Sequence, residues 1–71
     1  MLSADKARRN LLSAMTRFRQ SHDVTERLTN VVLAKAAGVS ADTISNWLAY
    51  AGWTLDKLDV EWARRRPKKP E

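Results

Sequence analysis

The sequence predicts an all-α fold: a small bundle of four helices that contains a helix-turn-helix and ends in an extended basic tail. Apolar residues recur every three or four positions along four segments, which is the spacing of one helix face. Two glycines, Gly38 and Gly52, separate the last three segments. Beyond residue 66 the chain holds only prolines and charged residues, which neither continue a helix nor add to a core.

The first helix is expected from about Ala4 to Gln20, where no glycine or proline interrupts the pattern. Ser3 or Asp5 can cap its N-terminus. Its apolar stripe consists of Ala7, Leu11, Ala14, Met15 and Phe18.

The second helix has two alternative starts. Asp23 followed by Glu26 resembles a capping box and would begin the helix near Val24, whereas Thr29 is an equally good cap and would begin it later. In both alternatives the helix ends at Gly38, because glycine adopts a left-handed backbone at little cost.

The third helix is expected from Ala41 to about Tyr50, with Ser40 as its cap and Gly52 closing it. Ile44, Trp47 and Leu48 share one side of this helix.

A fourth helix, capped by Thr54, is expected to continue to about Arg65 with Leu55, Leu58 and Trp62 as its stripe. The chain then divides into a domain of residues 1–66 and a basic, proline-containing tail or linker of residues 67–71.

Length and composition bound the class of protein. A chain of 71 residues forms one domain at most, and it buries only roughly 60–65% of its unfolded surface. There is no cysteine, so neither a disulfide nor a thiolate zinc site is available. The longest aliphatic run is Val31 to Ala34, so we expect no membrane span and a soluble, cytoplasmic protein.

The net charge of +5 comes from the two ends of the chain. Residues 1–20 hold five basic side chains against one acid, and residues 64–69 hold five more, whereas residues 21–63 hold three against six acids. Such a distribution favours an anionic partner that is anchored by the ends.

The sequence gives little support to catalysis. The single histidine, His22, lies beside Asp23 in a polar segment, and its expected role is that of a surface side chain. No glycine-rich phosphate loop or nucleophile and base pattern is present. We therefore expect no enzyme, no metal, no cofactor and no small-molecule ligand.

The segment around Gly38 has the pattern of two helices that cross steeply. Ala34 permits close approach, Gly38 can take a positive φ, and Val39 and Ile44 can fill the wedge between the helices. This is the geometry of a helix-turn-helix, and it turns the other side of the third helix outward. That side holds Ala41, Asp42, Thr43, Ser45 and Asn46, whose short side chains can approach base edges.

The same segment resembles the helix-turn-helix of bacterial and phage regulators. The matching stretch is "LAKAAGVSADTISNW", and "MTRFRQ" is similar to the arginine-bearing first helix of the lambda-repressor/Cro type. "AKAAGVSADTI" also resembles the homeodomain-like N-terminal domain of the tetracycline-repressor type, so both subfamilies stay open. The resemblance implies a sequence-specific double-stranded DNA-binding transcriptional regulator, a repressor by expectation, in the bacterial cytoplasm with the nucleoid.

A third helix in the major groove would contact bases through its N-terminal half. Asn46 can pair bidentately with adenine, while Asp42 is also explained by the helix dipole. The full set of expected base contacts is Ala41, Asp42, Thr43, Ser45 and Asn46. The expected phosphate contacts are Arg17, Arg19, Lys35, Ser40, Tyr50, Arg64, Arg65, Arg66, Lys68 and Lys69.

The three tryptophans are expected in the core or in an interface. A homodimer through the fourth helix, with Leu55, Leu58 and Trp62, would bury the surplus apolar surface and match palindromic half-sites.

Two other functions stay open. One is a protein-interaction module of the antiactivator kind on the same scaffold, which the acidic middle and the tryptophans favour. The other is a recombination directionality or architectural factor, which would bend its DNA site.

Overall fold

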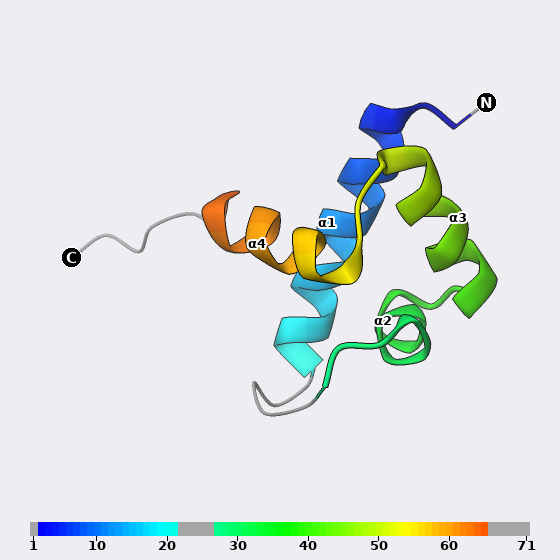
Figure 1. Ribbon diagram of the computed structural model, residues 1–71. Helices are drawn as coiled ribbons and strands as arrows, with labels where there is room; N and C mark the ends of the chain where they lie inside the picture. Colours follow the sequence, from blue (N-terminus) through cyan, green and yellow to red (C-terminus); the bar gives the residue numbers. More distant parts are fainter. Residues whose placement is uncertain (1, 22–26, 66–71) are drawn as a thin grey trace.

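The computed structural model describes residues 2–21 and 27–65, and it contains four helices (Figure 1). They are α1 (Ala4–Ser21), α2 (Asn30–Ala37), α3 (Ala41–Ala51) and α4 (Leu55–Arg65). All the regular structure in these residues is helical, which confirms the predicted all-α class. The predicted tail of residues 67–71 lies outside the described residues.

Each helix begins at a hydroxyl side chain. The hydroxyl oxygen accepts a hydrogen bond from the backbone N–H three residues later, at 3.1 Å for Ser3, 3.2 Å for Thr29, 3.2 Å for Ser40 and 3.1 Å for Thr54. A cap of this kind stabilises a helix by about 0.5–2 kcal/mol. Of the two starts predicted for the second helix, the structure has the later one, at Thr29.

α2 and α3 end in the same turn. Gly38 and Gly52 both have a left-handed backbone, with φ of +73° and +71°. In each turn the residue after the glycine donates its N–H to the carbonyl oxygen five residues earlier, Val39 to Ala34 at 3.0 Å and Trp53 to Leu48 at 3.1 Å. This is the Schellman arrangement, which satisfies the last carbonyl groups of a helix and redirects the chain sharply.

The core is built around α1. Its predicted stripe is fully confirmed, because Ala7, Leu11, Ala14, Met15 and Phe18 are all buried. The other three helices contribute Leu33, Ala34, Ile44, Ala51 and Leu58 to the same cluster. Each buried Leu, Ile, Phe or Met side chain contributes about 1.5–3 kcal/mol to folding, so this cluster is the main stabilising element.

The helices are arranged on different sides of α1. α2 and α3 pack against each other and against α1, whereas α4 packs against α1 (Figure 1). In Figure 1 α2 is seen nearly end-on, whereas α3 is seen from the side. The axes of these two helices are therefore steeply inclined to each other. α3 and α4 lie on opposite sides of α1.

The tryptophans pack against the core, as expected. Trp47, Trp53 and Trp62 are all partly buried there. The Trp62 Nε1–H donates to Thr16 Oγ1 at 3.0 Å, which docks α4 onto α1. Of the stripe expected to form a homodimer, Leu58 is fully buried, whereas Leu55 and Trp62 are partly buried, so the homodimer stays a prediction.

No helix among the described residues combines the length and the apolar character that crossing a lipid bilayer requires.

Candidate nucleic-acid interface

One side of α3 faces solvent because the other side packs into the core. Ile44 and Ala51 are buried, and successive residues turn by about 100° around a helix axis. The residues on the far side are therefore exposed. We call them the α3 strip: Asp42, Ser45, Asn46, Ala49 and Tyr50.

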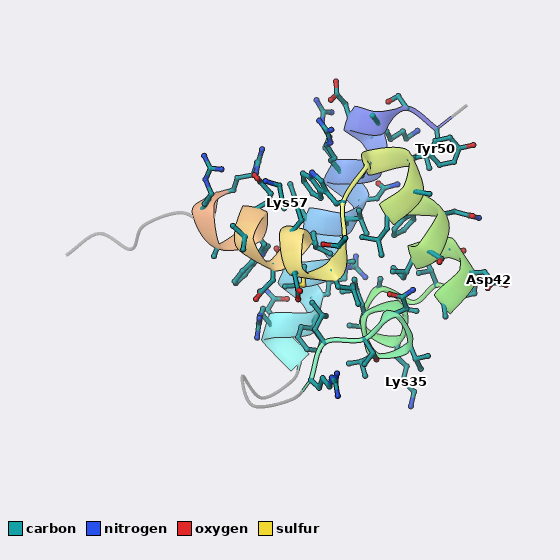
Figure 2. The ribbon with its side chains drawn as sticks, viewed as in Figure 1. Lys35, Asp42, Tyr50 and Lys57 are labelled. Atoms are coloured by element: carbon teal, nitrogen blue, oxygen red, sulfur yellow. The ribbon has the colours of Figure 1, made fainter. Side chains whose placement is uncertain are left out.

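The α3 strip contains three of the five predicted base contacts and one predicted phosphate contact. Asp42, Ser45 and Asn46 are exposed, and the side chain of Tyr50 is largely exposed as well. Asp42 and Tyr50 lie at opposite ends of α3, on the outer side of the protein (Figure 2). Ala49 also belongs to the strip, and its position one helical turn after Ser45 was the signal in the sequence that could have identified it.

The other two predicted base contacts, Ala41 and Thr43, are half-buried at the edges of the strip. The hydroxyl oxygens of Thr43 and Ser40 lie 2.9 Å apart and share a hydrogen bond. The Thr43 N–H donates to Ser40 Oγ as well, at 3.2 Å. Ser40 and Thr43 thus form one hydroxyl pair at the N-terminus of α3, with Ser40 exposed and Thr43 half-buried.

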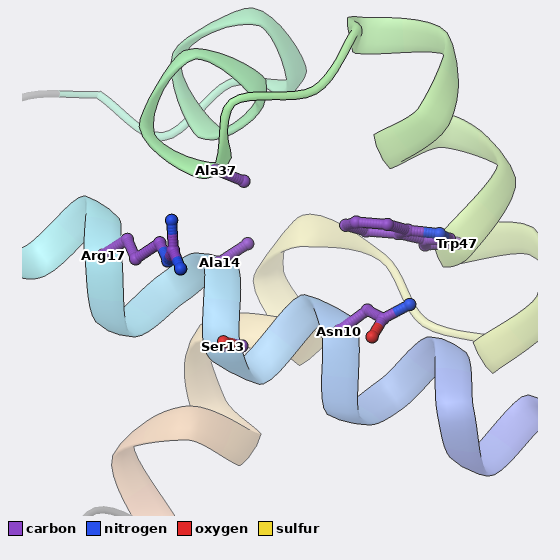
Figure 3. A pocket seen from close by; sticks show the side chains of 6 residues that line it. All are labelled: Asn10, Ser13, Ala14, Arg17, Ala37 and Trp47. Carbon is purple, nitrogen blue, oxygen red and sulfur yellow. The ribbon is translucent and has the colours of Figure 1, made fainter.

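Two predicted phosphate contacts flank the α3 strip. Lys35 is exposed on α2 and points away from the body of the protein (Figure 2). Arg17 is exposed on α1 and faces the end of α2 across an open hollow (Figure 3). These two cations lie on different helices, and both helices pack against α3.

The hollow lies where α1, α2 and α3 meet (Figure 3). It measures about 160 Å³, below the roughly 300–1,000 Å³ of typical small-molecule sites. Its lining contains a guanidinium group, an amide, a hydroxyl and an indole ring. The lining residues are Asn10, Ser13, Ala14, Arg17, Ala37 and Trp47. Asn10 and Ser13 were not predicted from the sequence, because they line the site only once α3 packs on α1.

Arg19, another predicted phosphate contact, is engaged within the fold. Its Nη2 lies 2.7 Å from Oδ1 of Asp59, and its guanidinium lies 5.8 Å from the centre of the Trp62 ring. Both partners are on α4, on the other side of α1 from the α3 strip.

Arg64 and Arg65 surround a carboxylate on α4. Glu61 is 6% exposed, and its Oε2 lies 3.0 Å from Nζ of Lys57 and 3.4 Å from Nη1 of Arg64. Arg65 pairs with the other carboxylate oxygen. Hydrogen bonds from Arg65, and next from Lys57, lower the pKa of Glu61 from 4.5 to about 2. The carboxylate therefore holds three cations in place at neutral pH.

The remaining predicted phosphate contacts, Arg66, Lys68 and Lys69, lie outside the described residues, as does His22. Within the described ranges, no three side chains of His, Cys, Asp and Glu cluster closely enough to hold a metal ion.

Comparison of the chain with protein-family models, with curated proteins and with solved structures finds no significant match.

Proposed function

We propose that the protein is a sequence-specific double-stranded DNA-binding transcriptional regulator. In this proposal α2, residues 38–40 and α3 form a helix-turn-helix of the lambda-repressor/Cro or tetracycline-repressor type, and α3 enters the major groove. The observation that carries the proposal is the α3 strip. A solvated surface helix usually presents Lys and Glu, whereas this strip presents Ser45, Asn46 and Ala49 between Asp42 and Tyr50.

The chemistry of the strip suits base edges. The major groove is about 12 Å wide and admits an α-helix whose side chains are short. The Asn46 amide can donate to N7 and accept from N6–H of adenine, the Ser45 hydroxyl can donate or accept, and the Ala49 methyl can contact a thymine methyl. The steep inclination of α2 to α3 supports this docking, because it lets α3 project from the body.

The flanking groups suit phosphates. Lys35 and Arg17 supply positive charge on the two helices beside α3, and Ser40 presents its hydroxyl at the N-terminus of α3. A helix N-terminus favours a phosphate through its partial positive charge.

Repression would follow when the bound protein occupies an operator and excludes polymerase. A homodimer on palindromic half-sites would form through α4, where Leu55 and Trp62 are only partly buried.

Selection of bound duplexes from a random pool tests this proposal. We expect enrichment of one short sequence at physiological salt, because base contacts discriminate by about 1–3 kcal/mol each. A pool that stays random after several rounds while the protein binds it would contradict sequence-specific recognition.

A protein-interaction module is the second candidate, because α3 carries no positive charge that would attract DNA. The only charged residue of α3 is Asp42, and large apolar surface is exposed on Val31 of α2 and on Tyr50. A salt series separates the two functions. DNA affinity falls steeply with salt as counterions are released, whereas no duplex affinity, or an affinity unaffected by salt, would indicate a protein partner.

A further inference from the structure

A second cationic surface lies on α4. Lys57, Arg64 and Arg65 surround Glu61, and their side chains remain 51%, 70% and 54% exposed despite these ion pairs. Arg8 of α1 joins them through Trp53, because the guanidinium groups of Arg8 and Arg65 lie 5.4 and 5.9 Å from the centre of that ring. We call Lys57, Arg64, Arg65 and Arg8 the α4 cationic surface.

The α4 cationic surface carries a surplus of positive charge in a fixed geometry. Three of the cations pair with one carboxylate and Arg8 lies over the Trp53 ring, so most of the positive charge is available to an external anion. Along α4 the cations span residues 57 to 65, which is about 12 Å at 1.5 Å per residue. Glu61 and Trp53 hold the guanidinium groups before a ligand arrives, which lowers the entropy lost on binding.

The α4 residues of this surface are set apart from the α3 strip, whereas Arg8 reaches the end of α3, where its Nε donates to the Ala51 carbonyl oxygen at 3.1 Å. The C-terminal end of α4 and α3 lie on opposite sides of α1 (Figure 1). Lys57 is on the α4 side, away from Asp42 and Tyr50 (Figure 2). The C-terminal end of α4 therefore lies on the side of α1 away from a duplex seated on the α3 strip.

We propose that the α4 cationic surface binds the phosphate backbone of a second DNA segment, so that one protein molecule joins two duplexes. This inference rests on the proposed function of α3. A duplex carries one negative charge per about 1.7 Å of its axis, which matches a row of cations some 12 Å long. Guanidinium groups bind phosphate bidentately and without regard to base sequence.

A two-duplex capture assay tests the proposal. A duplex with the selected sequence is immobilised and saturated with the 71-residue protein, and a labelled duplex of unrelated sequence is then added. Arg64→Gln/Arg65→Gln removes two charges from the α4 cationic surface. The matched control, Arg9→Gln/Arg27→Gln, removes two exposed charges elsewhere. Circular dichroism and thermal melting check that each variant is folded.

We expect the wild-type protein to capture the second duplex. Arg64→Gln/Arg65→Gln should lower that capture on the order of 10-fold while its affinity for the first duplex changes by less than about 2-fold. The control variant should retain capture. A folded variant with Arg64→Gln alone should lie between the wild type and the double variant.

Four outcomes overturn the proposal. In the first, the wild type captures no second duplex, and in the second, the α4 variant and the control lose capture equally. In the third, the α4 variant captures normally, so that contacts between protein copies join the duplexes. In the fourth, poly-glutamate binds in a manner that depends on Arg64 and Arg65, but a second duplex does not bind. Failure of the α3 proposal looks different. Arg64→Gln/Arg65→Gln would then abolish binding to the first duplex, and changes in the α3 strip would leave that binding intact.

Discussion

Nη2 of Arg19 lies 2.7 Å from Oδ1 of Asp59, a partner 40 residues away, and this ion pair joins α1 to α4. The Arg19 guanidinium also lies 5.3 Å from the centre of the Phe18 ring and 5.8 Å from that of Trp62. Arg19 thus stabilises the interface between α1 and α4.

Arg19→Ala should lower the free energy of unfolding by about 1–2 kcal/mol. The change removes a partly exposed ion pair and the ring contacts, which contribute roughly 0.2–1 and 0.5–1 kcal/mol. Urea unfolding measures the difference. Arg17→Ala, an exposed arginine on the same helix, is the control and should stay within about 0.5 kcal/mol of the wild type. Equal stabilities of the two variants would contradict this role of Arg19.

Glu61 makes the free energy of unfolding depend on pH in the acid range. Its pKa falls from 4.5 in the unfolded chain to about 2 in the fold, so the folded state favours the ionised carboxylate. The resulting stabilisation is complete above pH 4.5 and is lost as the pH falls through about 2. The difference in unfolding free energy between the wild type and Glu61→Gln should therefore narrow from pH 6 to pH 2. Asp56→Asn, on the same helix, is the control, and a difference that stays constant with pH would count against the proposed charge network.

Gly38→Ala should destabilise the protein by about 1 kcal/mol. An added Cβ meets no atom within 4 Å, so the left-handed backbone is the only source of the penalty. Asn tolerates this backbone, so Gly38→Asn should be the less destabilising of the two changes. Thermal unfolding compares them. Destabilisation by Asn that equals or exceeds that by Ala would show that the penalty is not one of backbone conformation.

Arg17→Gln and Lys35→Gln should each reduce the salt dependence of DNA affinity. One phosphate contact contributes about 0.9 to the slope of log K against log salt, so each variant should flatten the slope by roughly that amount. Arg9→Gln is the control and should leave the slope unchanged. An unchanged slope in the Arg17 variant would contradict a phosphate contact by Arg17.

The helices and the core could be predicted from the sequence because their signals are local. Three kinds of signal lie within a turn or two of the helix face or helix end that they determine. They are the apolar stripe from Ala7 to Phe18, the Ser and Thr caps, and the two glycines. The same local signals repeat in a way that the sequence analysis missed. Gly38-Val39-Ser40 and Gly52-Trp53-Thr54 follow one pattern and form the same turn and cap.

The candidate site could be predicted only in part. The exposure of Ser45 and Asn46 follows from helical periodicity. The pairing of Arg19 with Asp59 and the meeting of Asn10 with Trp47 depend on how α1 packs against distant helices, which no local pattern encodes. For that reason the sequence predicted Arg19 and Arg17 to have the same role, whereas the structure places only Arg17 beside α3.

Replacing Asn46 by Ala, with affinity measured on the selected duplex and on a scrambled one, tests the central claim that the α3 strip reads bases. We expect affinity for the selected duplex to fall by about 1–3 kcal/mol, or roughly 5- to 150-fold, with little change on the scrambled duplex. Gln20→Ala, which removes an exposed amide from α1, should change neither affinity. An equal loss on both duplexes, or no loss on the selected one, would contradict the claim.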